Sequence, residues 1–525
     1  MTGKNIVGAS LSGEGKEIFY GENPATGQKL EPGFYEATES EINKAIEKAS
    51  DAFQTYRNIS GKDKAAFLEI IADEIVSLSE ELIKRCIDET GLPEARLTGE
   101  RARTVGQLKL FASLLREGSW VDARIDTADP DRKPLPKADI RSMQRPLGPV
   151  GVFGASNFPL AFSVAGGDTV SALAAGCPVV FKAHPAHPGV CELVGLAIQR
   201  AVKKSNMPEG TFSMVNGRSN QVGMTLVRHP SIAAIGFTGS YRGGKALFDE
   251  ANKRPVPIPV YAEMGSTNPV FILPDALKQR KEKIAQDLTA AVTLGVGQFC
   301  TNPGLVFVPD SDDSSKFKDV LATNFKGIAA GVMLTAGIQG SYQKGIEKLS
   351  GIDGVDTLAK GLSEGSGSRG TPHLLHASID SFLKDHTLEE EVFGPSTLTI
   401  TANTKGQLLQ AAKNLGGHIT ATLHGTEKDL EEYSDLVAVL EQKAGRLIVN
   451  GYPTGVEVCH SMVHGGPFPA TTDSRTTSVG TGAITRFTRP VCYQNFPAAL
   501  LPAELRDGNP LGIWRLVNGE RQKSG

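Results

Sequence analysis

The segment VGVFGASNFPLAFSVAGGDTVSALAAGCPVVFKA, residues 150–183, decides the expected fold. It begins with a short apolar run, passes through a loop into a helix-like stretch of small residues, and ends in a second apolar run. A strand, a crossover helix and a second strand in this order are typical of a parallel β-sheet covered by helices. Strand-like runs at 212–217 and 232–239, separated by helix-like stretches, continue the series. The sequence therefore predicts an α/β protein.

Outside this series, four further regions are distinguishable. Apolar residues at helical spacing predict helices throughout 40–118. Alternating residues around a Pro-rich centre predict a projecting hairpin or arm at 120–148. A second α/β region is expected from 268 onward, and within it 340–373 is predicted to be a helix followed by a surface loop. The tail after 445 is expected to be mostly loop and short strands.

Length and composition exclude several classes of protein. With 525 residues, two or three domains are expected, and 40% hydrophobic and 22% charged residues are typical of a globular protein. The net charge of -3, without a basic stripe, argues against nucleic acid as a partner. The uncharged run 146–167 contains Gly, Pro and Asn, which disfavours a membrane span, and residues 1–19 lack the apolar core of a signal peptide.

Cysteine usage predicts a reducing compartment. Six cysteines are scattered over a long chain without tight pairing, a pattern that favours free thiols and a cytoplasmic protein. They are Cys86, Cys177, Cys191, Cys300, Cys459 and Cys492.

Two glycine-rich motifs lack part of the pattern that would make them nucleotide sites. Residues 365–370, GSGSRG, fit G-x-G-x-x-G, but neither a preceding strand nor a following helix is expected there. Residues 239–246, GSYRGGKA, nearly fit the P-loop, but Ala246 stands where Ser or Thr must bind Mg²⁺. In the second motif Ser240 nevertheless opens a helix after a strand, which presents backbone N–H groups to a phosphate.

Histidines provide no convincing metal site. His184 and His187 form one group, and Cys459, His460 and His464 form another. Neither group has a second cluster at the spacing of a metal centre. We therefore expect surface or loop histidines and no metal.

Four separate segments carry residues suited to chemistry. Asn157 and Glu263 each follow an expected strand, where ligands of parallel sheets bind, and could serve as oxyanion donor and as a base of raised pKa. Cys300 follows the expected end of an apolar helix, where a thiolate is activated, although a cysteine there could equally be a core residue. Glu391 and Phe393 could bind sugar hydroxyls and a flat ring. Taken singly, each residue has a structural explanation.

Together these segments resemble the aldehyde dehydrogenase superfamily. The resemblance extends over roughly residues 20–500, with the pieces in the family's order. The family's signatures are found as Ser156-Asn157-Phe158-Pro159, Phe237-Thr238-Gly239-Ser240, Glu263-Met264-Gly265, Gly297-Gln298-Phe299-Cys300 and Glu391-Val392-Phe393-Gly394-Pro395.

The resemblance implies a covalent mechanism. Cys300 attacks an aldehyde carbonyl to give a thiohemiacetal, whose oxyanion is held by the Asn157 side chain and the Cys300 backbone N–H. Hydride transfer to NAD(P)⁺ leaves a thioester, and Glu263 activates the water that hydrolyses it.

The resemblance also implies a set of cofactor-binding residues. They are Lys182, Gly239, Ser240, Gly265, Glu391 and Phe393. NAD-preferring members often carry an acidic residue three positions after the lysine, whereas this chain has Pro185. No carboxylate there would repel a 2′-phosphate, so NADP is the expected cofactor, with NAD as the alternative. A second departure, Ser266 in place of a glycine, is expected to change little because Gly265 is kept.

Within the superfamily, residues 101–189 most resemble α-ketoglutarate semialdehyde (2,5-dioxovalerate) dehydrogenases. Such a substrate carries a carboxylate far from its aldehyde. Arg103 and Gln107, on one helix face, are expected to bind it, together with Phe158. The alternatives are an NADP-linked dehydrogenase of fatty or aromatic aldehydes, a thiol esterase or acyltransferase, or a binding protein without activity.

The resemblance finally implies a domain organisation. A Rossmann-like cofactor-binding domain is expected at 1–119 and 148–266, and an α/β catalytic domain at 267–460. A β arm, 120–147 and 480–500, is expected to join subunits into a homodimer or homotetramer. Beyond its subunits and a small aldehyde, neither nucleic acid nor a membrane is expected as a partner.

Overall fold

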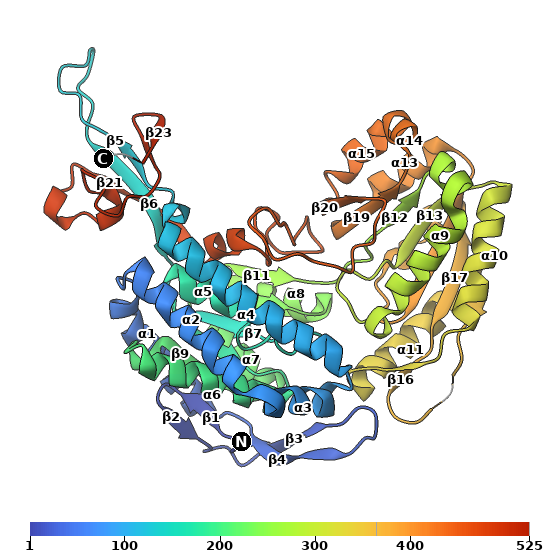
Figure 1. Cartoon of the computed structure of the whole chain (residues 1–525), viewed down its shortest axis with the longest axis horizontal. Coiled ribbons are helices and arrows are strands. Elements are labelled where there is room, and N and C mark those ends of the chain that lie inside the picture. Colours follow the sequence, from blue (N-terminus) through green and yellow to red (C-terminus); the bar gives the residue numbers. More distant parts are fainter. Residues whose placement is uncertain (364, 524–525) are drawn as a thin grey trace.

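The computed structural model describes residues 1–363 and 365–523, which build two large sheets and a projecting arm (Figure 1). The first sheet has the order β11-β10-β7-β8-β9-β1-β2, and its strands from β7 to β11 pair in parallel. Its strands are β1 (Asn5–Val7), β2 (Ser10–Ser12), β7 (Val150–Phe153), β8 (Val179–Lys182), β9 (Phe212–Val215), β10 (Ala234–Thr238) and β11 (Val260–Glu263). The predicted parallel sheet is confirmed, while the antiparallel edge β1–β2 was not predicted.

Helices cover the first sheet and bury a core of aliphatic and aromatic side chains. They are α1 (Glu39–Tyr56), α2 (Gly61–Ser77), α3 (Ser79–Thr90), α4 (Glu94–Glu117), α5 (Gly167–Ala175), α6 (Pro188–Lys204), α7 (Asn220–Arg228) and α8 (Tyr241–Asn252). The predicted helices of 40–118 are confirmed. A capping box between Thr38 and Glu41 starts α1, and Gly91, in the left-handed region at φ 65°, ends α3.

The second large sheet has the order β15-β17-β18-β13-β12-β19-β20 and is parallel except for β15. Its strands are β12 (Val270–Ile272), β13 (Leu305–Pro309), β15 (Val355–Lys360), β17 (His373–Ser378), β18 (Ser396–Ala402), β19 (His418–His424) and β20 (Ala444–Val449). Its helices are α9 (Pro274–Thr293), α10 (Asp312–Lys326), α11 (Ala336–Ser350), α12 (Ile379–Lys384), α13 (Lys405–Asn414), α14 (Glu427–Glu432) and α15 (Ser434–Leu440).

The prediction of a surface loop after α11 is wrong in part. Its first half is β15, which closes the sheet edge, and its end is β16 (Arg369–Gly370), paired with β14 (Gly331–Val332). The motif 365–370 therefore follows a strand, contrary to expectation, but it runs into β16 and β17 instead of the helix that a dinucleotide fingerprint requires.

The arm is a five-stranded sheet of order β21-β6-β5-β22-β23. Its strands are β5 (Arg124–Asp126), β6 (Ile140–Pro146), β21 (Thr488–Gln494), β22 (Arg515–Val517) and β23 (Glu520–Gln522). The predicted hairpin is confirmed by the antiparallel pairing of β5 with β6. Residues 515–522 also join this sheet, beyond the range expected for the arm. A separate hairpin, β3 (Ile18–Glu22) with β4 (Lys29–Tyr35), lies near the N-terminus.

The short segment between β11 and β12 connects the two large sheets and leads to the site. Ser266 in this connection lines a narrow, solvent-open cleft together with Gly297, Glu391 and Phe393. Residues predicted from distant parts of the sequence therefore share one cleft. Among the described helices, we find none that combines the length and the apolar character needed to span a membrane.

Candidate active site

The chain turns sharply before Cys300. Helix α9 ends at Thr293, so the helix predicted to continue to 297 is replaced by a tight turn. Three successive residues, Gly295, Val296 and Gly297, take left-handed φ angles of 55°, 59° and 64°. At Gly297 a Cβ atom would lie 2.2 Å from the Gly394 carbonyl oxygen, so only glycine fits. The turn brings Cys300 out of the core to a partly exposed position.

Asn268 fixes the loop that carries Cys300 through side-chain hydrogen bonds. This fully buried residue, with φ 46°, donates from Nδ2 to the carbonyl oxygens of Cys300 at 2.9 Å and Asn302 at 3.0 Å. Its Oδ1 accepts from the Ser266 and Thr420 hydroxyls at 3.0 Å each. Asn268 therefore links the cysteine loop to the segment after β11 and to β19. The sequence offered no pattern that singled it out.

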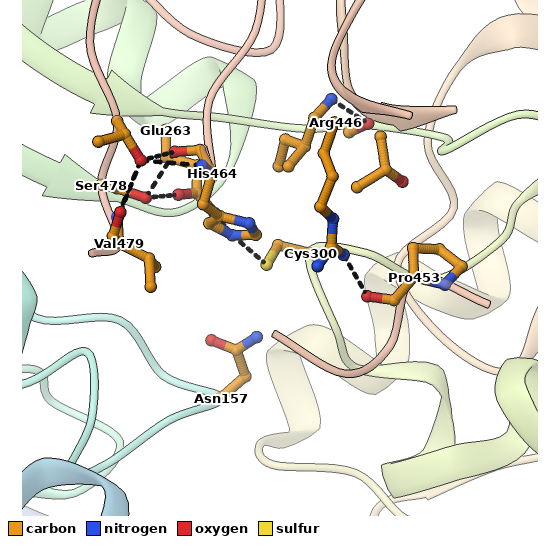
Figure 2. A network of polar contacts seen from close by, with 12 residues as sticks. Asn157, Glu263, Cys300, Arg446, Pro453, His464, Ser478 and Val479 are labelled. Carbon is orange, nitrogen blue, oxygen red and sulfur yellow. Dashed lines mark hydrogen bonds and ion pairs between the residues drawn. The ribbon is translucent and has the colours of Figure 1, made fainter. Parts of the chain in front are cut away.

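A histidine joins the predicted nucleophile to the predicted base (Figure 2). His464 Nε2 lies 3.5 Å from Cys300 Sγ and 3.0 Å from Glu263 Oε1. The other carboxylate oxygen of Glu263 accepts a hydrogen bond from the Ser478 hydroxyl. His464 lies in a loop, one of the two positions expected for it, but it is fully buried and not at the surface. Neither His464 nor Ser478 was predicted to belong to the site.

These contacts set the protonation of Glu263 and Cys300. Burial alone raises the pKa of Glu263, but the charge and hydrogen bond of His464 and the Ser478 hydroxyl outweigh it, so the pKa lies below its ordinary value. The raised pKa expected for this base is therefore wrong. Burial, and then the neighbouring Glu263 charge, raises the pKa of the Cys300 thiol well above its ordinary value. In this state, Glu263 is ionised and Cys300 is a thiol.

Asn157 lies in the same site, on the loop after β7. Its side chain is buried, and Nδ2 donates to the Gln298 carbonyl at 3.0 Å. One amide hydrogen is thus fixed, and the geometry of the planar amide then fixes the second. The loop is anchored by Arg96, which donates to the Asn157 carbonyl at 2.7 Å, and by Glu100, which accepts from the Leu160 and Ala161 amides.

The same cluster contains donor atoms of the kind that bind metals. One atom each from Glu263, Cys300 and His464 lies within 4.8 Å of the others, and Glu, Cys and His are the usual ligands of zinc. Their mutual hydrogen bonds already account for this arrangement. His187 also lies in a loop, as expected, but it is fully buried, with Nδ1 3.3 Å from Cys191 Sγ.

The predicted cofactor residues surround the start of α8 and the cleft. Gly239 N–H donates to the Glu263 carbonyl at 3.1 Å, and Ser240 caps α8 by accepting from Gly243 N–H at 3.3 Å. Glu391 lies directly against Gly265, where a Cβ atom would come within 2.5 Å of its carboxylate. The Glu391 side chain is exposed to solvent, and the protein atoms around its carboxylate raise its pKa to about 8 by desolvation.

Lys182 ends β8, at the same edge of the first sheet where β10 leads into Gly239 and α8. Burial of its ammonium group lowers its pKa to about 8. Such a group gains from a polar partner, because an enclosed charge without one is costly. The N-terminus of α8, the glycine at 265 and this lysine together form a set that fits a dinucleotide: a helix end for the pyrophosphate, a glycine that leaves room, and a cation for ribose hydroxyls.

Two of the predicted substrate residues, Arg103 and Gln107, lie on α4, and the third, Phe158, lies on the loop after β7. Arg103 is partly exposed, its guanidinium lies 5.8 Å from the Phe158 ring, and its charge acts on Cys300 and Glu263. Phe158 packs edge-on against Phe299, the residue before Cys300. Gln107 is buried against Gly167, and its Nε2 has no hydrogen-bond partner among the described residues.

A comparison with known proteins decides the family. The model of the aldehyde dehydrogenase family matches residues 11–477. The chain belongs to the aldehyde dehydrogenase family. Members of this family use NAD(P) to oxidise aldehydes to carboxylic acids, so the protein is an NAD(P)-dependent aldehyde dehydrogenase.

Individual relatives agree with this assignment. The chain is 50% identical to α-ketoglutaric semialdehyde dehydrogenase 2 of Azospirillum brasilense over 523 residues, which cover 99% of this chain and 100% of that protein. It is also 50% identical to α-ketoglutaric semialdehyde dehydrogenase of Acinetobacter baylyi, over 93% of this chain and 92% of that one. A variant of aldehyde dehydrogenase from Bacillus cereus, 22% identical, shares the fold with a TM-score of 0.79 over 94% of this chain and 96% of that chain.

Proposed function

We propose that this dehydrogenase oxidises α-ketoglutarate semialdehyde to α-ketoglutarate with NADP⁺. The contact of Cys300, His464 and Glu263 beside Asn157 carries the chemistry. The substrate assignment is supported by two relatives named for this semialdehyde, to which the chain is 50% identical over nearly its full length. Arg103, whose charge reaches Cys300, provides a cation for the substrate's carboxylate.

In the first half of the reaction, the Cys300 thiol loses its proton to solvent, and the resulting thiolate attacks the aldehyde carbonyl and forms a thiohemiacetal. His464 Nε2–H, which here faces Glu263, stabilises the thiolate by donating to Sγ at the observed 3.5 Å separation. The oxyanion receives the second amide hydrogen of Asn157 and the Cys300 backbone N–H. Preorganised donors of this kind cost no rearrangement when the charge develops.

In the second half, Glu263 accepts a proton from the water that attacks the thioester. The lowered pKa keeps this carboxylate ionised at neutral pH, and Ser478 holds one of its oxygens in place. Hydrolysis breaks the bond between carbonyl carbon and Sγ, releases the carboxylic acid and returns Cys300.

NAD(P)⁺, when bound, supplies the acceptor for the hydride. We assign its pyrophosphate to the N-terminus of α8 at Gly239 and Ser240, and its adenosine ribose to Lys182. We assign its nicotinamide ribose to Glu391, which lies beside Gly265, and we expect Phe393 to pack on the nicotinamide ring. Because Pro185 replaces the acidic residue near Lys182, no side chain at that position repels a 2′-phosphate, which favours NADP over NAD.

The substrate and assembly complete the proposal. Arg103, with Gln107 and Phe158, lines the path of the aldehyde.

The arm at 120–147 and 480–500 joins subunits into a homodimer or homotetramer. The domain bounds 1–119 with 148–266 and 267–460 follow the two large sheets. All six cysteines are free, which favours a reducing, cytoplasmic environment.

A panel of aldehydes assayed with both cofactors tests the proposal. We expect the highest kcat/KM for α-ketoglutarate semialdehyde with NADP⁺, followed at 340 nm. Preference for long alkyl or aromatic aldehydes would reassign the substrate. Preference for NAD⁺ would show that Pro185 does not set the cofactor.

A further inference from the structure

Arg446 approaches the catalytic cysteine (Figure 2). It belongs to β20, and its side chain extends toward Cys300 (Figure 2). Its Nη1 donates to the Gly455 carbonyl at 3.0 Å and its Nη2 to the Pro453 carbonyl at 2.7 Å. Nε is buried and has no hydrogen-bond partner in the part of the chain that the structure describes.

Among the described residues, no carboxylate lies within ion-pair distance of the Arg446 guanidinium. Burial of the guanidinium lowers its pKa, and no ion pair with it is formed among the described residues. Two of its five N–H groups are used by neutral carbonyls, which leaves Nε–H and further hydrogens for another acceptor. A half-buried cation without a charged partner is energetically unfavourable until an anion binds to it.

Arg103, on α4, is in a related condition. Its Nε is also buried without a hydrogen-bond partner among the described residues, and burial is the main cause that lowers its pKa. Carboxylates act on the Arg103 charge through space, yet no described carboxylate forms an ion pair with it. The site thus presents two arginines with spare N–H groups near one thiol.

We propose that Arg446 is a specificity-determining residue that, together with Arg103, binds the carboxylate at the far end of the aldehyde substrate. The proposal rests on the proposed function and names the substrate class: short aldehydes whose other end is a carboxylate or an α-keto acid. A guanidinium binds a carboxylate through two parallel hydrogen bonds, and the free Nε edge of Arg446 offers this geometry.

Two other roles for Arg446 make different predictions. Through Pro453 and Gly455 it could merely hold the loop after β20, and through its charge it could stabilise the Cys300 thiolate. Either role affects every aldehyde equally, because loop and thiolate serve all substrates. Only recognition of an anion separates charged from neutral aldehydes.

The test compares Arg446→Met and Arg446→Lys with wild type on α-ketoglutarate semialdehyde and on pentanal, a neutral aldehyde of equal length. For Arg446→Met, we expect KM for the acid to rise roughly 10- to 100-fold, the scale of a lost charged hydrogen bond, and the pentanal constants to change less than about twofold. Arg446→Lys keeps the charge but loses the paired hydrogen bonds, so its KM for the acid should lie between those of wild type and Arg446→Met. Calorimetry should show a parallel loss of α-ketoglutarate affinity.

The matched control is Arg254→Met. Arg254 is a buried arginine that also donates to two carbonyls, those of Val227 and Pro230, at 3.1 Å each, on the first sheet's side of the molecule. Its loss should lower stability without changing the ratio of acid to pentanal kcat/KM. Equal losses on both aldehydes in Arg446→Met, or an unchanged KM for the acid, would overturn the inference. A wild-type enzyme without preference for the acid would instead overturn the proposed function.

Discussion

Cys300 differs from the other five cysteines in its neighbours, since it alone lies beside His464 and Glu263. Cys300→Ala removes the nucleophile, so we expect no detectable dehydrogenase activity, while NADP⁺ binding measured by calorimetry survives. The control is Cys492→Ala, an exposed thiol of the arm strand β21, which should keep wild-type rates. Substantial turnover by the Cys300 variant would remove the covalent mechanism.

Glu263 is assigned to the hydrolytic half of the reaction. Glu263→Gln keeps the shape and a hydrogen bond to Ser478 but cannot accept a proton. We expect a normal stopped-flow burst of NADPH, followed by a steady state slowed roughly 10²- to 10⁴-fold, the range for a general base. If the burst itself disappeared, Glu263 would instead be needed to deprotonate the Cys300 thiol.

His464 controls the pH dependence through Glu263. Its charge and hydrogen bond lower the pKa of Glu263, so in His464→Phe, where burial remains, that pKa rises. Glu263 must be ionised to act as base, so the acid limb of the steady-state rate should move to higher pH in the variant. The rate at pH 6 should then fall relative to pH 8. His460→Phe, an exposed neighbour, is the control, and an unmoved acid limb would contradict the role given to His464.

At the scale of elements, α4 positions the loop that carries Asn157. Glu100 on α4 is buried and accepts with one oxygen from the Leu160 and Ala161 amides at 2.8 and 2.9 Å. Glu100→Ala leaves two buried N–H groups unsatisfied, at about 1–3 kcal/mol each, so both thermal stability and kcat should fall.

Glu100→Gln tests whether Glu100 acts through its hydrogen bonds to the two amides or through its charge. Glutamine keeps a carbonyl oxygen for both amides, and burial raises the pKa of Glu100, so the site favours a neutral side chain. We therefore expect near wild-type melting temperature and kcat for Glu100→Gln. A loss as large as that of the alanine variant would mean that the charge, not the hydrogen bonds, matters.

At the scale of the whole molecule, the arm has a small core of its own. Leu505 is fully buried there with Val121, Ile125 and Met143. Leu505→Ala should cost about 2–5 kcal/mol of local stability and weaken subunit assembly, measured by light scattering and thermal unfolding. The exposed Leu511→Ala is the control. An unchanged mass at low protein concentration in the Leu505 variant would argue against the arm as the subunit interface.

The sequence by itself determined the order of elements and much of the site. Apolar runs alternating with helical spacing predicted the parallel strands from β7 to β10, because strand and helix periodicity are local properties. The signatures around Asn157, Glu263 and Cys300 identified the family for the same reason: the residues of each lie next to one another in the chain. Turns were harder, as the left-handed residues before Cys300 show, because a packed neighbour at Gly394 requires them.

Only the tertiary structure brought His464, Ser478 and Arg446 to these residues. They come from β20 and the irregular segments that follow it, where no periodicity marks a residue, and His464 is 201 positions from Glu263 in sequence. The pKa of a buried group is the sum of burial and of all charges and hydrogen bonds around it. Burial by apolar neighbours could be inferred for Glu263 from the sequence, but the partners that reverse its effect come from across the fold, so folding alone decided the direction.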